Sequence, residues 1–366
     1  MIRRLVCRNV RGLEDTTWEP GPGAQLLLGG TGQGKTSLLE SLYIACTTRS
    51  FRTSRLADCV AFEAAERGDG FFTSVEIERT ARARLEVAWS ARDGLSRSVN
   101  GDRSSLGEHV GRQPILAWSA ADSEVLVGAP EARRRLVDRV GVSVRPAALD
   151  LLGAYRKTLE HKRALLQQKA DLESLQSFQT LLVGAAEDLI VFRARTIGRL
   201  REALTSVLGE VEGDPLDIEV RYRSSPALPE EVNVNDLSAG WSDAAFQRQL
   251  ERERVMQRPL VGPHRDRIDV LFRGRPVAET ASAGERKAIG LILVAAQSRV
   301  LSEADRAPVL LIDDIDTEMD QKTLERVWPL LSGAPQTLVS SNREGVFENL
   351  AIPRVWRVRD GSVKGE

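Results

Sequence analysis

The amino-acid sequence predicts an α/β protein in which two sheet-containing parts flank a mostly helical insertion. Apolar patterns typical of strands lie before about residue 120 and again from residue 268 onward. The stretch between them has helical periodicity, and a glycine-rich loop joins an early strand to a helix. We expect the first part to cover residues 1–125, the insertion 126–254 and the last part 255–366.

Composition and charge limit the classes of protein to consider. The 366 residues are 42% hydrophobic and 28% charged, which is enough for two compact domains and excludes a disordered chain. Basic residues number 51 and acidic residues 52, so any nucleic-acid surface must be local. No apolar run reaches membrane-spanning length, and the three cysteines lack disulfide or metal spacing. We therefore expect a cytoplasmic protein with no membrane partner.

The first part is predicted to contain strands around one early helix. Gln25–Leu28 is an apolar strand candidate, and Ser37–Cys46 has a helical apolar pattern. Residues alternate between the two faces of a sheet over Phe72–Ile77 and Leu85–Trp89. Asn100-Gly101 predicts a hairpin turn, because both residues tolerate a positive φ angle.

The insertion is predicted to contain two antiparallel helices that pack together. Apolar residues recur at three- and four-residue steps, which places them on one face of each helix. They are Leu152, Tyr155, Leu159 and Leu166 in the first helix, and Phe178, Leu182, Ala185, Leu189 and Phe192 in the second. These residues alone indicate an ordinary helical subdomain.

Strand patterns return after a loop at 224–238 that is rich in Pro, Ser and Asn. Apolar residues alternate over Ile268–Phe272, a turn follows at Arg273–Arg275, and a helix is expected over Ala288–Leu301. Val309–Ile312 is fully apolar, as in a buried parallel strand. Two more strands are expected, over 336–339 and 355–358.

The strongest chemical motif is a phosphate-binding loop. It consists of Gly29, Gly30, Thr31, Gly32, Gln33, Gly34, Lys35 and Thr36, and it fits G-x-x-x-x-G-K-[ST] between a predicted strand and a predicted helix. Backbone N–H groups of such a loop, together with the helix N-terminus, bind phosphates. We expect Lys35 to contact the β- and γ-phosphates of a nucleotide and the Thr36 hydroxyl to bind Mg²⁺.

Two carboxylates follow the apolar strand at 309–312. At a strand end, Asp313 would complete the Mg²⁺ site, and Asp314 would orient or deprotonate the attacking water. Apolar strands that end in Asp are common. The prediction therefore depends on the phosphate-binding loop earlier in the chain.

The segment Ser282-Ala283-Gly284-Glu285 has two interpretations. S-x-x-E before an apolar helix is a capping box that needs no ligand, and the local residues alone favour it. A capped helix N-terminus beside Gly284 could also accept a phosphate. The order of motifs favours this second use. A phosphate-binding loop, a long insertion, S-x-G and then Asp-Asp is the order found in ABC-type ATPases.

Further short motifs extend over nearly the whole chain. In order they are Leu5–Arg11, the phosphate-binding loop, Ser50–Thr53, Gly128–Pro130 with Arg133–Arg135, Gly262–Asp266, Ser282–Arg286 and Leu310–Asp320. With these motifs the chain resembles the RecF family of bacterial recombination and repair ATPases, which are relatives of SMC and Rad50 heads. The resemblance implies an ABC-type (SMC/Rad50-like) P-loop ATPase head with an inserted, mostly helical arm domain.

The resemblance also implies a function. Members bind ATP and Mg²⁺, dimerise on ATP, bind double-stranded and gapped DNA, and help a RecR-like mediator protein to load recombinase during repair, replication restart and the SOS response to DNA damage. A slow, DNA-stimulated ATPase is expected, with Lys35, Asp313 and Asp314 as its catalytic residues. Ser282 and Gly284 would face the nucleotide of the opposite subunit, and Gly262–Asp266 would lie near the nucleotide site and the dimer surface.

Two basic clusters are candidates for DNA contacts. They are Arg49, Arg52 and Arg55, and Arg133, Arg134 and Arg135 within the basic stretch 131–170. Charge alone favours a solvated helical face, whereas the family resemblance favours DNA phosphates. Because few aromatic residues lie between them, backbone contacts that weaken with salt are expected rather than base readout.

Several positions differ from the family pattern. Thr31 replaces the usual Asn or Ala, Trp118–Asp122 contains no Gln, Glu160–Arg163 replaces Gln-Arg-Asn, and Ser340–Asn342 contains no His. The chain is therefore a divergent member or a paralogue with other partners. A nucleotide-gated scaffold with vestigial hydrolysis, acting through protein contacts, remains the alternative. The short insertion disfavours an SMC- or Rad50-like tether, and Gly262–Asp266 disfavours a transporter ATPase.

Overall fold

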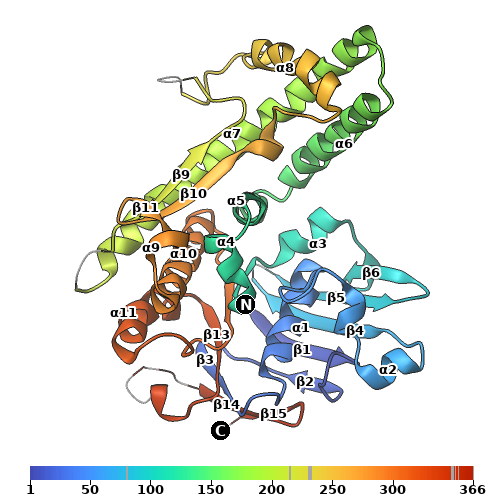
Figure 1. Ribbon diagram of the computed structural model, residues 1–366. Helices are drawn as coiled ribbons and strands as arrows, with labels where there is room; N and C mark the ends of the chain where they lie inside the picture. Colours follow the sequence, from blue (N-terminus) through green and yellow to red (C-terminus); the bar gives the residue numbers. More distant parts are fainter. Residues whose placement is uncertain are drawn as a thin grey trace. The chain divides into compact units, whose positions relative to one another are not determined.

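The computed structural model describes residues 1–365 except 80, 214–215, 230–232, 348–349, 351 and 353. The chain forms two compact units (Figure 1). Unit 1 comprises Met1–Leu126, Ala203–Leu216 and Ala281–Glu366, and unit 2 comprises Val127–Glu202 and Asp217–Thr280.

The unit boundaries differ in part from those expected at 125/126 and 254/255. The first division follows Leu126, but unit 2 extends to Thr280, and 203–216 belongs to unit 1. The reason is the antiparallel pairing of β9 (Ile218–Arg223) with β10 (Arg267–Phe272). This pairing keeps β10 in unit 2, whereas the expected boundary at 254 falls inside helix α8 (Asp243–Met256).

Unit 1 contains a six-stranded sheet whose inner strands are parallel. Its order is β15 (Ser362–Gly365), β14 (Arg354–Arg359), β3 (Gly23–Leu28), β13 (Gln336–Ser341), β12 (Val309–Ile312) and β8 (Ile115–Trp118), with only β15 antiparallel. β12 and β13 are buried along their whole length, as expected for strands covered on both faces. The carboxyl ends of β3, β13, β12 and β8 meet at one edge, which is where open α/β sheets bind ligands.

A second, antiparallel sheet completes unit 1. Its order is β2 (Thr16–Trp18), β1 (Ile2–Arg8), β4 (Phe71–Glu78), β5 (Arg82–Ser90), β6 (Gly94–Val99) and β7 (Asp102–Arg103). The predicted hairpin at Asn100-Gly101 is confirmed, since both residues have positive φ and join β6 to β7. The helices are α1 (Lys35–Thr47), α2 (Phe62–Glu66), α3 (Leu106–Arg112), α4 (Glu124–Val127), α10 (Ala283–Glu303) and α11 (Gln321–Ser332). A single apolar core joins α1 to strands of both sheets.

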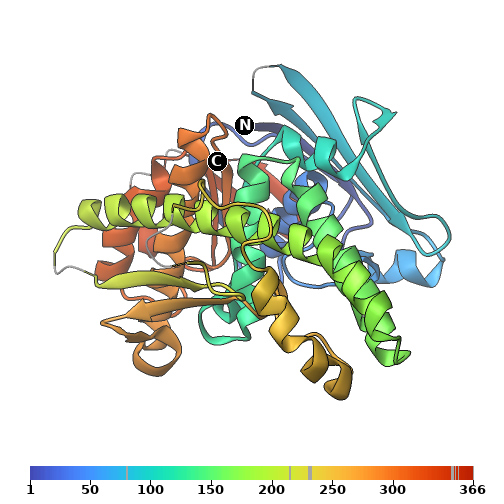
Figure 2. The same ribbon diagram turned by 90° about the horizontal axis from the view of Figure 1, so that it is seen from above.

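Unit 2 is mostly helical with a small antiparallel sheet. Its elements are α5 (Pro130–Val144), α6 (Ala148–Gln167), α7 (Leu172–Glu210) up to Glu202, β9, α8, β10, β11 (Arg275–Pro276) and α9 (Val277–Thr280). Figures 1 and 2 show β9 and β10 running beside α7, and Arg201 of α7 donates to the Val220 carbonyl of β9. No helix in the described part of the chain combines the length and apolar character needed to cross a membrane.

The predicted packing of the two insertion helices is confirmed. Tyr155 and Leu159 of α6 lie in one buried cluster with Leu182 and Leu189 of α7. Phe246 of α8 completes this cluster, and its contribution had not been predicted.

Candidate nucleotide-binding site

The phosphate-binding loop leads from β3 into α1 and needs its glycines. Gly32 and Gly34 have φ angles of 82° and 107°, which side chains disfavour. A Cβ atom on Gly29 would lie 2.2 Å from the Val358 carbonyl oxygen. Gln33 holds the loop, because its Oε1 accepts from the Asp360 N–H at 2.7 Å. Gly30 and Thr31 are exposed at the tip of the loop.

Lys35 is the first residue of α1, and its side chain is buried over the loop. Its ammonium donates to the carbonyl oxygens of Gly29 at 2.7 Å and Gly30 at 2.9 Å. An ammonium has three donors, so one remains for a phosphate oxygen. The residues fit the phosphate groups of a nucleotide, because a cation and backbone N–H groups share one small space.

Thr36 and Asp313 meet at the edge of the parallel sheet. The Thr36 hydroxyl donates to Asp313 Oδ1 at 2.9 Å, and the Ser340 hydroxyl donates to the same oxygen at 2.7 Å. Burial raises the pKa of Asp313. A hydroxyl and a carboxylate so close together are oxygen ligands of the kind Mg²⁺ takes beside phosphates. The sequence analysis noted Ser340 only within Ser340–Asn342, a segment without His, and did not predict its contact with Asp313.

Asp314 lies beside this pair in a left-handed backbone conformation, with φ of 47°. Its N–H donates to Ser340 Oγ at 2.8 Å. The buried ammonium of Lys287 donates to the Asp314 carbonyl. It also donates to the carbonyl and to the hydroxyl of Thr317, each at 2.7 Å. Burial lowers the pKa of Lys287 to about 8. Lys287 therefore fixes the loop after β12 to α10, a role with no motif signal in the sequence.

Ser282 is the N-cap of α10, and the predicted capping box is present. The hydroxyl and the N–H of Ser282 both donate to Glu285 Oε2, at 2.8 and 2.9 Å. In return, the Glu285 N–H donates to Ser282 Oγ at 3.3 Å. Gly284 packs closely, since a Cβ there would lie 2.6 Å from the Glu318 carbonyl oxygen. Ser282 is exposed. Its use as a phosphate ligand of another copy stays a prediction.

The segment Trp118–Asp122 lies at the same edge as Asp313. The Asp313 N–H donates to the Trp118 carbonyl at 2.8 Å. Asp122 Oδ2 accepts from both the N–H and the hydroxyl of Ser119 at 2.9 Å. Ser119 and Asp122 therefore hydrogen-bond to each other and cap the short helical turn after Trp118. The family pattern has other residues at these positions.

The first basic cluster lies just after α1 in unit 1. Arg52 donates to the buried Glu40 at 3.3 Å, and Arg55 lies 4.0 Å from Asp58. Arg49 is exposed. The pKa of Glu40 is lowered overall. Burial alone would raise it, but the hydrogen bonds and positive charges around the carboxylate, including that of Arg52, have the larger effect.

The second cluster serves mainly to hold unit 2 together. Arg133 donates to the carbonyl oxygens of Gly128 and Ile268, and Arg134 donates to the Asp266 carbonyl at 2.8 Å. Both side chains are half-buried, whereas Arg135 is exposed and pairs with Glu131 at 2.9 Å. Arg133 and Arg134 were expected to contact DNA. The donors named above bond to backbone within unit 2, and a contact of these arginines with DNA stays a prediction.

Gly262–Asp266 likewise forms a structural centre of unit 2. The buried Asp266 accepts from Arg193 and from the Tyr222 hydroxyl, both at 2.8 Å. Tyr155 and His264 Nδ1 share a hydrogen bond of 2.7 Å. Asp266 and His264 thus make contacts within unit 2, and the expected position of this loop near the nucleotide site stays a prediction.

Comparison with known proteins extends these observations. The model of the AAA domain family matches residues 4–190, just over half of the chain. A protein of Pelotomaculum thermopropionicum named "DNA replication and repair protein RecF" is 29% identical, covering 99% of this chain and 100% of its own. Its namesake in Geotalea daltonii is 24% identical, covering 99% of both.

Solved structures agree on the fold. The structure of the recombination mediator protein RecF with ATP, described as part of the RecFOR pathway, has a TM-score of 0.87. It is 23% identical, covering 100% of this chain and 97% of the other. An SMC head bound to the C-winged helix domain of ScpA has a TM-score of 0.55 at 14% identity, covering 100% and 96%. The chain therefore belongs to the AAA domain family, and the resemblance to RecF of the ABC/SMC-like ATPases that its sequence motifs indicate is confirmed.

Proposed function

We propose that the chain is an ATP-binding protein of DNA replication and repair, and that ATP joins two copies of it on double-stranded or gapped DNA. The observation that carries this proposal is the 2.9 Å hydrogen bond from Thr36 to Asp313. It joins the phosphate-binding loop to the end of β12, and a chance glycine turn would need no such carboxylate.

Each residue of the site then has a task. The loop N–H groups and Lys35 bind the β- and γ-phosphates, and Thr36 and Asp313 hold Mg²⁺. When bound, Mg²⁺ offsets part of the phosphate charge. Asp314 orients or deprotonates the attacking water, so slow, DNA-stimulated hydrolysis is expected.

The proposed dimerisation is based on the exposed N-terminus of α10. Ser282 and Gly284 lie at this end, where the first N–H groups of the helix and its dipole favour a negatively charged ligand. We infer that they bind the γ-phosphate held by a second copy. ATP would then hold two copies together, and hydrolysis would release them.

The role in DNA metabolism draws on the relatives, whose names describe replication and repair. A RecR-like mediator protein is the proposed partner, and the assistance of recombinase loading is the proposed outcome. Arg49, Arg52 and Arg55 remain candidates for DNA phosphates, because all three are at least partly exposed.

A nucleotide-gated scaffold is the second candidate. It is favoured by the mutual cap of Ser119 and Asp122, which stands where the family pattern has a residue that contacts nucleotide. In such a scaffold, ATP would still bind and dimerise the chain, but hydrolysis would be vestigial and the ligand would be protein.

One experiment separates the two candidates. The purified chain is titrated with duplex and gapped DNA, with and without ATP, while light scattering follows its mass. We expect the mass of the protein to double when ATP is added. We also expect DNA to bind this dimer. Doubling without DNA binding in any nucleotide state would favour the scaffold. Failure to bind ATP would contradict both candidates.

A further inference from the structure

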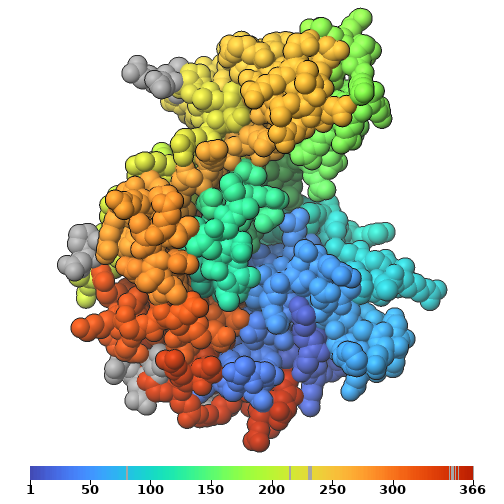
Figure 3. Space-filling model, in the orientation of Figure 1, coloured from blue at the N-terminus to red at the C-terminus, as the bar shows by residue number. Residues whose placement is uncertain are grey.

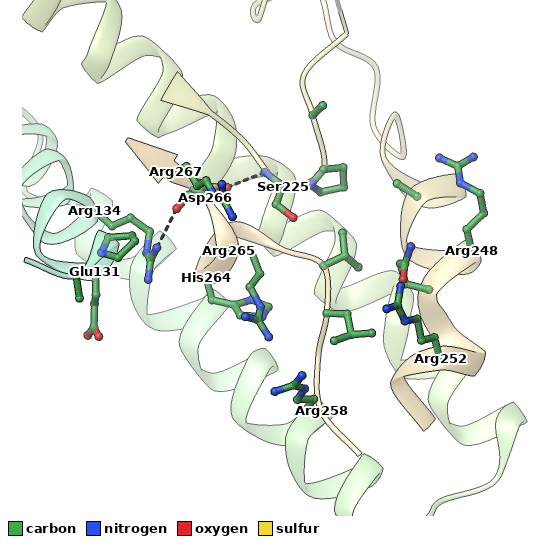
Figure 4. A pocket seen from close by; sticks show the side chains of 18 residues that line it. Glu131, Arg134, Ser225, Arg248, Arg252, Arg258, His264, Arg265, Asp266 and Arg267 are labelled. Atoms are coloured by element: carbon green, nitrogen blue, oxygen red, sulfur yellow. Dashed lines mark hydrogen bonds between the residues drawn. The ribbon is translucent and has the colours of Figure 1, made fainter. Parts of the chain in front are cut away.

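Unit 2 contains a cavity of about 860 Å³ that is lined by arginines from several elements. Arg134 comes from α5 and Arg248 and Arg252 come from α8, as Figure 4 shows. The segment after α8 adds Arg258, Arg265 and Arg267. In Figure 3, α8 and the residues after it lie on the visible surface of unit 2. None of the candidate DNA contacts except Arg134 belongs to this arginine cavity.

The two acidic residues in the lining do not neutralise these arginines. Asp266 is buried and accepts from Arg193 at 2.8 Å, and Arg193 is outside the lining. Glu131 pairs at 2.9 Å with Arg135, which also lies outside it. The cavity therefore has a strong excess of positive charge.

The cavity arginines differ from three exposed arginines elsewhere in unit 2. Arg156, Arg221 and Arg254 each pair with a carboxylate, at 2.9, 2.7 and 3.2 Å. Among the residues that the structure describes, no carboxylate pairs with the exposed cavity arginines, namely Arg248, Arg252, Arg258, Arg265 and Arg267. Arg265 donates only to the Pro259 carbonyl, at 3.3 Å. Five guanidinium groups that pair with no carboxylate of the described residues thus line one hollow of the surface.

The lining also indicates what kind of anion fits. Its apolar members are Ala, Pro, Leu and Val, and no Phe, Tyr or Trp occurs among the described lining residues. Base stacking and the aromatic anchors common at protein interfaces are therefore absent from this surface. The lining cations are arginines, whose planar groups bind phosphate oxygens in pairs; burial lowers the pKa of His264 to about 4, so it is uncharged at neutral pH.

We propose that the arginine cavity binds the phosphate groups of a nucleic-acid backbone. The proposal rests on the proposed role in DNA metabolism and gives it a site in unit 2. Because the contacts are to phosphates, binding here depends on salt and not on base sequence. The N-terminus of α5, at Pro130 in the lining, adds further positive potential.

The test compares two triple variants of the full chain with equal changes in charge. The cavity variant carries Arg248→Glu, Arg252→Glu and Arg258→Glu. The control carries Arg156→Glu, Arg221→Glu and Arg254→Glu, at exposed positions of the same unit outside the cavity. Fluorescence anisotropy measures the binding of labelled duplex and gapped oligonucleotides over a series of salt concentrations. Binding of a fluorescent ATP analogue is measured alongside.

We expect the cavity variant to bind DNA at least about tenfold more weakly. The slope of log K against log salt should become shallower by about 2 to 3, since three phosphate contacts are lost. The control should keep a slope close to that of the unchanged chain, and both variants should bind the ATP analogue normally. If the cavity variant unfolds at a lower temperature, the same three positions as Gln provide a milder second variant.

Three results would overturn the inference. If both triple variants weaken DNA binding equally, only the overall charge matters, and the proposed function still stands. Polyglutamate and an unlabelled oligonucleotide are compared as competitors of labelled DNA at equal charge. If polyglutamate competes equally effectively, the cavity accepts an acidic protein segment. If the unchanged chain binds no DNA, the inference and the proposed function both fail.

Discussion

The chemistry proposed for this chain depends first on the ammonium of Lys35. Replacing Lys35 with Ala removes the cation over the phosphate-binding loop. ATP affinity should fall tenfold or more, by about 1.5–3 kcal/mol, as for a lost charge-assisted hydrogen bond. Titration with a fluorescent ATP analogue measures this, with Asp314→Asn as a control that keeps the loop intact. Unchanged affinity in Lys35→Ala would contradict the assignment of the loop.

A second residue-scale prediction concerns His264. Burial lowers its pKa to about 4, below the value near 6.5 of an exposed histidine. Between these pH values the unfolded chain binds a proton that the folded chain does not. The free energy of unfolding should therefore fall as the pH decreases from 6.5 to 4, by at most about 3 kcal/mol from this residue.

Urea unfolding of the unchanged chain and of His264→Asn, at pH 7 and at pH 4.5, measures this effect. The unchanged chain should lose more stability on acidification than the variant does. His161→Asn, at an exposed histidine of the same unit, controls for the substitution itself. Equal losses in the chain and in His264→Asn would show that His264 does not carry the effect.

The sequence could predict the site residues whose spacing is local. The motif Gly29–Thr36 and the cap of Ser282 fall in this class, and the structure contains both. The contact of Ser340 with Asp313 could not be predicted, because it requires β13 to lie beside β12 in the sheet. Strand order is a non-local property, and the sequence pattern of a strand does not state its neighbour.

At the scale of elements, α10 packs against β8 with no room at Gly290. A Cβ there would lie 1.9 Å from Trp118 Cη2. Gly290→Ala should lower the free energy of unfolding by about 1–3 kcal/mol or more, as in other overpacked cores. Gly184→Ala in α7 is the matched control, since nothing lies within 4 Å of its Cβ position. The control should gain about 0.5–1 kcal/mol. A tolerated alanine at position 290 would mean that this packing is wrong.

The anchoring of α5 on β10 gives a further element-scale prediction. Arg133→Ala removes donors to the backbone carbonyls of Gly128 and Ile268, and Arg133 lies outside the arginine cavity. The protein should unfold at a lower temperature, because its free energy of unfolding falls by about 1–3 kcal/mol. The salt dependence of DNA binding should stay unchanged. Arg135→Ala should change stability by less than about 0.5 kcal/mol. A shallower salt slope with unchanged stability in Arg133→Ala would instead favour Arg133 as a DNA contact.

Most elements could be predicted where the pattern was strong. The continuous apolar run of β12 and the helical periodicity of α6 and α7 are examples. β9 and α8 were missed. In β9, Glu219 and Arg221 separate the apolar residues of a short strand beside a Pro-rich loop, and α8 is highly polar. Both elements acquire their partners only through non-local packing, β9 with β10 and Phe246 of α8 with Leu182.

At the scale of the whole molecule, two units are built from interleaved segments of one chain. The order of motifs along the chain predicted the nucleotide site in the first and last parts, and every residue proposed to bind nucleotide lies in unit 1. The boundary near 254 could not be found by composition, because β10 joins unit 2 by pairing. The central claim concerns the two copies, which would each complete the site of the other.

Solution mass with and without ATP, measured by light scattering, tests this claim most directly. Asp314→Asn should form a stable dimer with ATP, because it keeps the phosphate-binding loop but lacks the carboxylate that activates water. Ser282→Arg should stay monomeric and still bind ATP. Ser282→Ala loses the cap, at a cost of about 1 kcal/mol, and the hydroxyl proposed to contact the γ-phosphate, but adds no bulk or charge, so it should dimerise more weakly. A monomeric Asp314→Asn in saturating ATP, or a Ser282→Arg monomer that no longer binds ATP, would contradict the composite site.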